Sequence, residues 1–108
     1  MKLEFRLRRA TDFSRVRQQG KSFAHPLLVL IALPNSNGEL RIGVAAGRSV
    51  GKAVERNRAK RRLRAAVAPL IPRMNTGWDI LFISRSAIRG AAYTEIQDGV
   101  RSVLTRAG

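Results

Sequence analysis

The chain's longest helical pattern runs from Val50 to Ala68 and carries two different faces. Ser49 is a candidate N-cap, and Pro69 is expected to end or kink the helix. At about 100° per residue, one stripe is apolar and predicts the face that packs on a core: Ala59, Leu63, Ala66, Val67 and Leu70. A second stripe is polar or small: Ala53, Asn57, Lys60, Arg61 and Arg64. The segment therefore predicts a surface helix that is anchored on one side and cationic on another.

The cationic side has almost no internal neutralisation. Arg58 and Arg62 are expected to flank its exposed part, and Glu55 is the only acid in the stretch. A helix that is merely solvated usually pairs opposite charges four residues apart, because like pairs destabilise it by about 0.2–0.5 kcal/mol each. The stacking of like charges therefore favours a surface that binds a polyanion over a simply solvated helix.

The composition of the whole chain points to the same class of partner. Lys and Arg number 21 against 7 Asp and Glu, which gives a formal net charge of +14 over 108 residues. The length suits one domain, residues 1–108. The longest apolar run, Leu27 to Leu33, is far shorter than the roughly 20 residues that span a bilayer. Cysteine is absent, which excludes disulfides and Cys-based zinc sites. We expect a cytoplasmic protein that binds nucleic acid and no membrane.

The strands are marked by apolar runs with turn residues between them. Pro26 to Leu33 predicts a buried strand, 34–38 a turn, and Glu39 to Ala46 a second strand that should pair with the first as an antiparallel hairpin. Trp78 to Ser84 predicts another buried strand, and a short extra strand is possible near Lys21 to Phe23.

Two more helices complete the pattern. The first is expected from Asp12 to Gln19, with Thr11 or Asp12 as its cap and Gly20 at its end. The last is expected from Glu95 to Thr105, with a capping box between Thr94 and Gln97. Its apolar face would be Ile96, Val100, Val103 and Leu104. The order helix, strands, helix, strand, helix predicts an α+β fold, in which helices cover a small sheet of about four strands. Strand order and crossover hand stay open at this point.

Individual residues near the basic helix suggest how it would contact RNA. Ala53 is small, so a phosphate backbone could approach closely there, and Asn57 could reach a base edge or a 2′-hydroxyl or could instead bond back to the protein. Gly47 and Gly51 flank the helix start, where backbone amides attract phosphate. A second basic patch is expected near the N-terminus, with Phe13 and Phe23 close to it. It comprises Lys2, Phe5, Arg6, Arg8 and Arg9.

The stretch from Val54 to Arg64 resembles the Arg-Asn-Arg signature of the bacterial ribonuclease P protein subunit family. Other segments resemble the family in the same order along almost the whole chain: Leu7-Arg8-Arg9, Asp12-Phe13, Arg41 to Val44, Gly51 to Val54, Asp79-Ile80 and Ile83 to Arg85. The resemblance implies an α+β sandwich with a left-handed β-α-β crossover, as in a ribosomal-protein domain, whereas the general rule for such units is right-handed.

The resemblance also implies a role. The chain would be the accessory protein subunit of an endoribonuclease, a hydrolase whose catalysis is carried by the RNA subunit with Mg²⁺. The protein would bind that ribonuclease P RNA and hold the 5′ leader of precursor tRNA, which promotes removal of the leader. The implied RNA-contact residues are Arg56, Asn57, Arg58, Lys60, Arg61 and Arg64, extended by Arg48, Lys52, Ala53 and the flanking Arg62. Phe13 would line a central cleft for the leader with Arg17 and Ile31, two positions where the family often has aromatics.

The residues also bear on three alternative functions. A self-sufficient nuclease is disfavoured, because His25 is the only histidine and the acids are scattered. A DNA-binding module would need more varied base-reading side chains than this helix offers. A structural ribosomal or RNA-chaperone protein without a role in cleavage remains the alternative, since charge, size and fold leave it open. The sequence indicates no oligomeric state.

Overall fold

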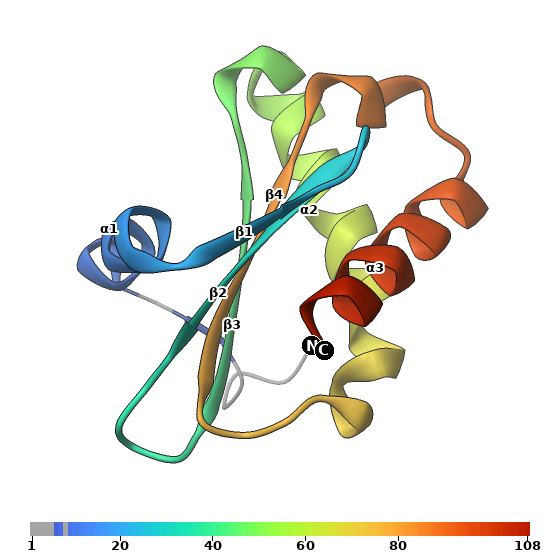
Figure 1. Ribbon diagram of the computed structural model, residues 1–108. Coiled ribbons are helices and arrows are strands. Elements are labelled where there is room, and N and C mark those ends of the chain that lie inside the picture. The colour runs from blue at the N-terminus through green and yellow to red at the C-terminus, as the bar shows by residue number, and fades with distance from the viewer. Residues whose placement is uncertain (1–5, 8) are drawn as a thin grey trace.

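The computed structural model describes residues 6–7 and 9–108, and Figure 1 shows their arrangement. The helices are α1 (Ala10–Gln19), α2 (Ala53–Val67) and α3 (Tyr93–Ala107), and the strands are β1 (Lys21–Ala24), β2 (Leu28–Pro34), β3 (Leu40–Ala46) and β4 (Trp78–Ser84). Three short 3₁₀ helices connect them: η2 (Arg48–Val50), η3 (Ala68–Arg73) and η4 (Ser86–Gly90). The expected helices and strands, including the short β1, are all present, and the fold is α+β as predicted.

The sheet order is β1-β2-β4-β3, so the predicted hairpin between β2 and β3 is wrong. Strand β4 lies between them, antiparallel to β2 and parallel to β3. The turn after β2 is held by the residue that leads into β4: the Asn35 N–H donates to the Gly77 carbonyl, and the Gly77 N–H donates to the Glu39 carbonyl, both at 2.9 Å. Turn chemistry alone cannot distinguish a tight hairpin from two strands with a third between them.

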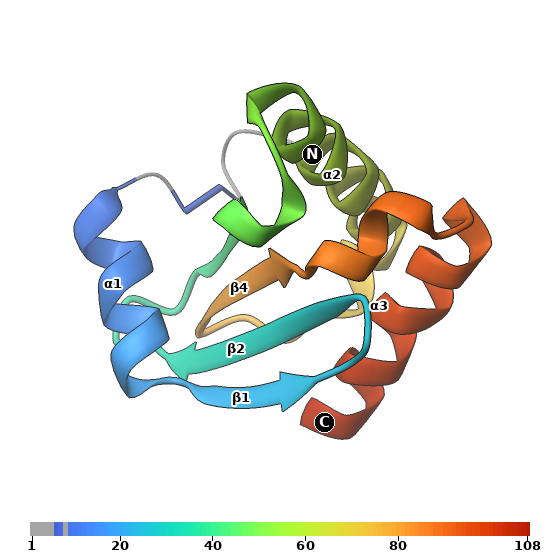
Figure 2. The same cartoon turned by 90° about the horizontal axis from the view of Figure 1, so that it is seen from above.

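The connection from β3 through α2 to β4 is left-handed, as the family resemblance implied. Strands β3 and β4 are parallel neighbours, and α2 lies on one face of the sheet. Viewed from that face with both strands pointing up, β4 lies to the left of β3 (Figures 1 and 2). The common preference for right-handed crossovers is therefore overridden in this chain.

The sheet is covered on both faces. Helices α2 and α3 pack on one face, and α1 packs on the other (Figure 2). The predicted apolar face of α2 is confirmed, since its side chains Ala59, Leu63, Ala66 and Val67 are buried, while Leu70 in η3 is partly buried. The predicted face of α3 is also confirmed: Ile96, Val100 and Val103 are buried and Leu104 packs against them. Within the described ranges, no helix combines the length and the apolar character needed to cross a membrane.

The helix starts differ from the expected ones. Helix α2 begins at Ala53, because Ser49 belongs to η2 and Gly51, at φ +138°, breaks the path between the two helices. Helix α1 begins at Ala10, two residues earlier than expected. Helix α3 begins at Tyr93, and its capping contact is the carboxylate of Glu95, which accepts a hydrogen bond from the Ala92 N–H at 2.8 Å, so the expected Thr94–Gln97 capping box is wrong.

A fully buried carboxylate, Asp79 of β4, ties α1 to the sheet. Arg41 of β3 donates to it through Nε at 2.9 Å and through Nη2 at 2.8 Å. Arg15 of α1 donates to Oδ2 at 2.5 Å, and the Asn35 amide donates to Oδ1 at 3.0 Å. Asp12 lies beside both arginines, 3.4 Å from Arg15 and 3.7 Å from Arg41. These contacts fix α1 at the end of the sheet where β4 begins.

The same contacts keep Asp79 charged. Burial by itself would raise the pKa of Asp79, but the hydrogen bonds from Arg41, Asn35 and Arg15 outweigh it, so the pKa lies below its usual value of 3.8. The hydrogen bond to Asp79 in turn raises the pKa of Arg41. The folded state thus binds a proton at Asp79 less tightly than the unfolded state does. The resulting stabilisation is complete above the unfolded pKa and is lost as pH falls through the lower folded pKa.

We expect Asp79→Ala to lower the free energy of unfolding by about 3 kcal/mol, because it leaves two arginines without their shared carboxylate. Urea unfolding followed by circular dichroism at pH 7, 5 and 3 would measure the effect. The native chain should lose stability between pH 5 and 3 more steeply than Asp79→Asn, which has no charge to titrate. Parallel pH profiles for the two proteins would contradict this account.

Candidate nucleic-acid interface

The polar and cationic residues of α2 and of the segment before it are together called the basic helix surface. It comprises Arg48, Lys52, Ala53, Arg56, Asn57, Arg58, Lys60, Arg61 and Arg64. Arg58 and Arg61 are exposed, as are Arg48 and Lys52 before the helix, whereas Arg56, Lys60 and Arg64 are half-buried. Val54, in the first turn, is 78% exposed and is the most exposed large apolar side chain described. The helix is held by its buried stripe, so these side chains project from a rigid support.

Arg62 differs from its predicted place on the exposed side. Its guanidinium points toward η4, where Nη1 donates to the Ile88 carbonyl at 3.2 Å and Nη2 donates to the Ala91 carbonyl at 2.6 Å. The Ile88 carbonyl also accepts the Ala91 N–H at 3.2 Å, and the Ala91 carbonyl directly follows η4. Arg62 does lie on the flank of the helix, but its long side chain reaches back to the protein instead of toward solvent. Arg62 therefore connects α2 to η4 in this structure.

The single acid of the helix is also directed away from the basic helix surface. Glu55 forms an ion pair with Arg89 of η4 at 3.6 Å. Arg89 lies far from Glu55 in the sequence, and only the fold brings the two side chains together. No sequence pattern therefore indicates this ion pair. The pairing with Arg89 directs Glu55 toward η4 and away from Arg61 and Arg64, although Glu55 still shares the hollow beside η4 with Arg58.

The N-terminal segment adds a cation to this surface. The Leu7 N–H donates to the Ile42 carbonyl at 2.7 Å, and Arg6 pairs with Ile42 as an isolated parallel bridge beside β3. This places Arg6 near Arg64. Burial lowers the pKa of Arg64, and repulsion by Arg6 lowers it further. The Arg64 Nε is buried without a hydrogen-bond partner in the described part of the chain. Two like charges held this close favour an anion between them.

The proposed N-terminal patch is thus partly joined to the basic helix surface. Arg6 and Arg64 come together, while Arg9 is exposed at the start of α1. Lys2, Phe5 and Arg8 lie outside the described residues. Phe23 packs against the core beneath α3, on the sheet face opposite Phe13, so the two aromatics do not share a surface.

The predicted cleft residues divide into two groups. Phe13 and Arg17 line a shallow hollow on α1 with Ala10 and Ser14. The ring of Phe13 lies over Gly43, where an added Cβ would come within 2.9 Å of it, so the glycine makes room for the aromatic.

Ile31 is not exposed beside them. It is 6% exposed and packs with Val16 and Leu81 beneath α1. Close contact is enforced at Gly20, where a Cβ would lie 2.5 Å from the Ile31 side chain. Ile31 therefore supports the hollow from below instead of lining it, and the predicted three-residue cleft is reduced to Phe13 and Arg17.

Most of the described carboxylates are engaged with cations or backbone. Asp79 and Asp12 face Arg15 and Arg41, and Glu55 faces Arg89. No cluster of three or more metal-ligating side chains occurs among the residues that the structure covers. His25 is engaged too, since its Nδ1 accepts a hydrogen bond from the Leu27 N–H at 3.1 Å. The chemistry that the described side chains present is the binding of anions.

Comparison with known proteins agrees with the fold. The family model for ribonuclease P matches residues 1–108. The ribonuclease P protein component of Chloroflexus aurantiacus is 43% identical over 108 residues, covering 99% of this chain and 80% of the relative. The ribonuclease P protein of Thermotoga maritima superposes with a TM-score of 0.81 at 27% identity, covering 94% of this chain and 96% of that one.

A third similar protein is a Staphylococcus aureus ribonuclease P protein variant described as defective in mRNA degradation activity. Its TM-score is 0.83 at 28% identity, with 95% of this chain and 87% of that one covered. The sequence match spans the whole chain, and the solved structures share its sheet and helices. The chain belongs to the ribonuclease P protein family.

Proposed function

We propose that this chain is the protein subunit of ribonuclease P, which binds the catalytic RNA through the basic helix surface and holds the 5′ leader of precursor tRNA at the α1 hollow. The observation that carries the proposal is the cationic face of α2, whose only acid is paired with Arg89 of η4. Such a surface suits phosphates held in a fixed arrangement, because Arg donates through a planar fork. Precursor tRNA is made in the bacterial cytoplasm, so we place the protein there.

Catalysis would belong to the RNA subunit. Mg²⁺ requires oxygen ligands that are free to coordinate it, and Asp79 already accepts hydrogen bonds from Arg41, Arg15 and Asn35. A protein-borne acid–base pair would need a histidine or carboxylate near a substrate site, whereas His25 caps its own turn. We therefore assign the Mg²⁺ ions that activate water to the RNA, with the protein contributing position and charge.

The direct test is reconstitution with bacterial ribonuclease P RNA and precursor tRNA at low Mg²⁺, with release of the 5′ leader as the readout. Cleavage should require both components and should be faster with the protein than with the RNA alone. A protein-only reaction with precursor tRNA and with an mRNA is included, given the activity named for the Staphylococcus aureus relative. Binding to RNA without stimulation of cleavage would favour a structural or chaperone role.

Arg61→Ala and Arg62→Ala form a matched pair. Arg61 is exposed on the basic helix surface, so its removal should weaken RNA binding roughly tenfold, which corresponds to about 1.4 kcal/mol of binding free energy. The melting temperature should not change. Arg62 donates to two backbone carbonyls, so its removal should lower the free energy of unfolding by about 1.5–3 kcal/mol. RNA affinity by filter binding and thermal melting measure the two effects. A reversed pattern would show that the two arginines have exchanged roles.

The same pair should differ in the salt dependence of RNA binding. Each neutralised phosphate contributes about −0.7 to −0.9 to the slope of log affinity against log salt concentration. Arg61→Ala should make the slope shallower by the contribution of about one phosphate contact, whereas Arg62→Ala should leave the slope unchanged. An affinity that does not respond to salt in the unsubstituted chain would exclude the electrostatic account altogether.

Leader binding is tested at Arg17 and Phe13. Arg17 is exposed, so Arg17→Ala should weaken precursor tRNA binding to the holoenzyme by about threefold to tenfold without loss of stability, and mature tRNA binding should not change. Phe13→Ala should have the same selectivity but also destabilise the chain, since the ring packs on Gly43. Gln18→Ala, exposed on α1 outside the hollow, is the control. Equal losses for precursor and mature tRNA would assign Phe13 to the core alone.

A further inference from the structure

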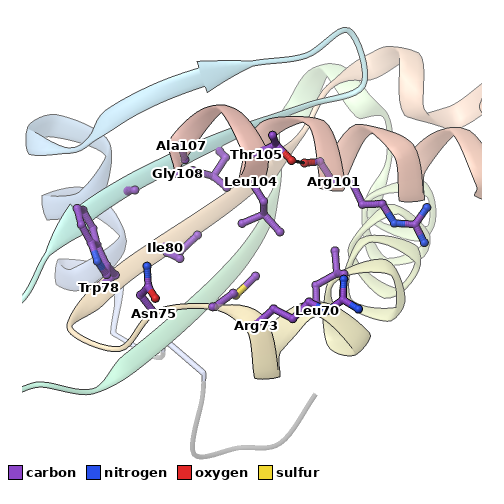
Figure 3. A pocket seen from close by; sticks show the side chains of 13 residues that line it. Leu70, Arg73, Asn75, Trp78, Ile80, Arg101, Leu104, Thr105, Ala107 and Gly108 are labelled. Carbon is purple, nitrogen blue, oxygen red and sulfur yellow. Dashed lines mark hydrogen bonds between the residues drawn. The ribbon is translucent and has the colours of Figure 1, made fainter.

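A pocket of about 380 Å³ lies on the sheet face opposite the α1 hollow, between the last turns of α3, η3 and the first residues of β4. Its floor is apolar and includes Leu30, Ile80 and Leu104. Figure 3 shows Trp78 and Asn75 at one end and the guanidinium groups of Arg73 and Arg101 toward the other. The volume is within the range of small-ligand sites, which are mostly apolar with a few placed polar groups.

The charged side chains that line this pocket are all cationic. Arg73 and Arg101 are both exposed, and its lining includes no Asp or Glu. Arg101 also faces Asp98 on its own helix at 3.5 Å, but side chains 61% and 76% exposed form a weak ion pair that a phosphate can replace. By contrast, the hollow lined by Arg58, Arg62 and Arg89 contains Glu55, which offsets part of its charge.

We propose that this pocket binds one unpaired nucleotide of an RNA strand. The base would stack on the indole of Trp78, the amide of Asn75 would reach the base edge with both a donor and an acceptor, and Arg73 and Arg101 would hold the flanking phosphates. Stacking of unpaired bases on aromatic rings, with arginine at the backbone, is the usual physical basis of single-strand recognition. A pocket with an aromatic end and a cationic end matches that chemistry.

The ligand class follows from the whole chain as well as from the pocket. With a formal net charge of +14, the protein attracts polyanions from all directions, so a nucleic-acid strand reaches this face more readily than a neutral ligand does. The pocket lies between α3, η3 and β4, and α3 covers the sheet face opposite α1 (Figure 2). No residue of the basic helix surface lines it. It rests on the proposed function only in taking RNA as the partner.

The chain offers a built-in probe, because Trp78 is its only tryptophan. The full chain would be titrated with an oligoadenylate of about six nucleotides, a length within the site sizes of single-strand binders. An abasic ribose-phosphate chain of equal length and charge, and AMP alone, would be titrated in parallel. Trp78 fluorescence and the Nε1–H signal of Trp78 in nitrogen–proton NMR spectra report occupancy. The oligoadenylate should quench the fluorescence and shift the Nε1–H signal. The abasic chain should bind about tenfold more weakly and should change neither the fluorescence nor the Nε1–H signal.

Variants separate the pocket from the basic helix surface. Arg73→Ala/Arg101→Ala should weaken the binding seen through Trp78 about tenfold, and Asn75→Ala should weaken it less. Arg58→Ala/Arg61→Ala removes the same charge from α2, so it should reduce overall RNA affinity and cleavage stimulation but leave the quenching at saturation intact. All of these residues are exposed, so thermal melts should match the unsubstituted chain.

Several results would overturn the proposal. Equal quenching by the abasic chain would mean that charge alone perturbs Trp78. AMP binding as tightly as the oligoadenylate would assign the pocket to free nucleotides. RNA binding with no response of Trp78 would leave the pocket to another occupant, such as a protein segment. None of these outcomes affects cleavage in the reconstituted holoenzyme, so failure here is distinguishable from failure of the proposed function.

Discussion

The buried carboxylate of Asp79 is the contact on which the arrangement of this protein depends. Its position at the start of the central strand lets it bind Arg41 from β3, Arg15 from α1 and Asn35 from the turn after β2. Four segments of the chain therefore meet at one charge. An isolated buried charge is too costly to persist, so the three donors must be in place together. The orientation of α1, and with it that of Phe13 and Arg17, follows from this requirement.

The arginines of this chain serve two physical ends. Some form hydrogen bonds within the fold: Arg62 donates to the Ile88 and Ala91 carbonyls, and Arg41 donates to Asp79. Others are left exposed, and the pairing of Glu55 with Arg89 directs the only acid of α2 toward η4. The charge that remains near Arg6 and Arg64 is repulsive in the free protein. A polyanion relieves that repulsion, so binding and folding stability are coupled in the same direction.

The periodicity of the sequence was enough to predict the elements and the buried faces of α2 and α3, because apolar spacing directly reflects which side meets the core. It could not predict that β4 separates β2 from β3, since the turn at 34–38 suits either arrangement. Nor could it find the partners of Asp79 and Glu55, which depend on tertiary structure. One signal was present: an aspartate inside an otherwise apolar strand indicates a buried charge that needs donors. In the predicted basic stripe, Ala53, Asn57 and Arg61 are exposed, whereas Lys60 and Arg64 are half-buried. Arg62 is bonded to backbone carbonyls near η4, and Ile31 is buried.

The central place of β4 has a consequence for how the chain is made. On a ribosome, β2 and β3 emerge well before β4, and neither can complete its hydrogen-bonding ladder until residues 78–84 have left the exit tunnel. During that interval two apolar strand edges stay open, together with a strongly cationic helix beside an RNA-rich machine. Long-range pairing of this kind slows folding. A nascent chain of this topology therefore depends on the rapid arrival of its last third to avoid unproductive contacts.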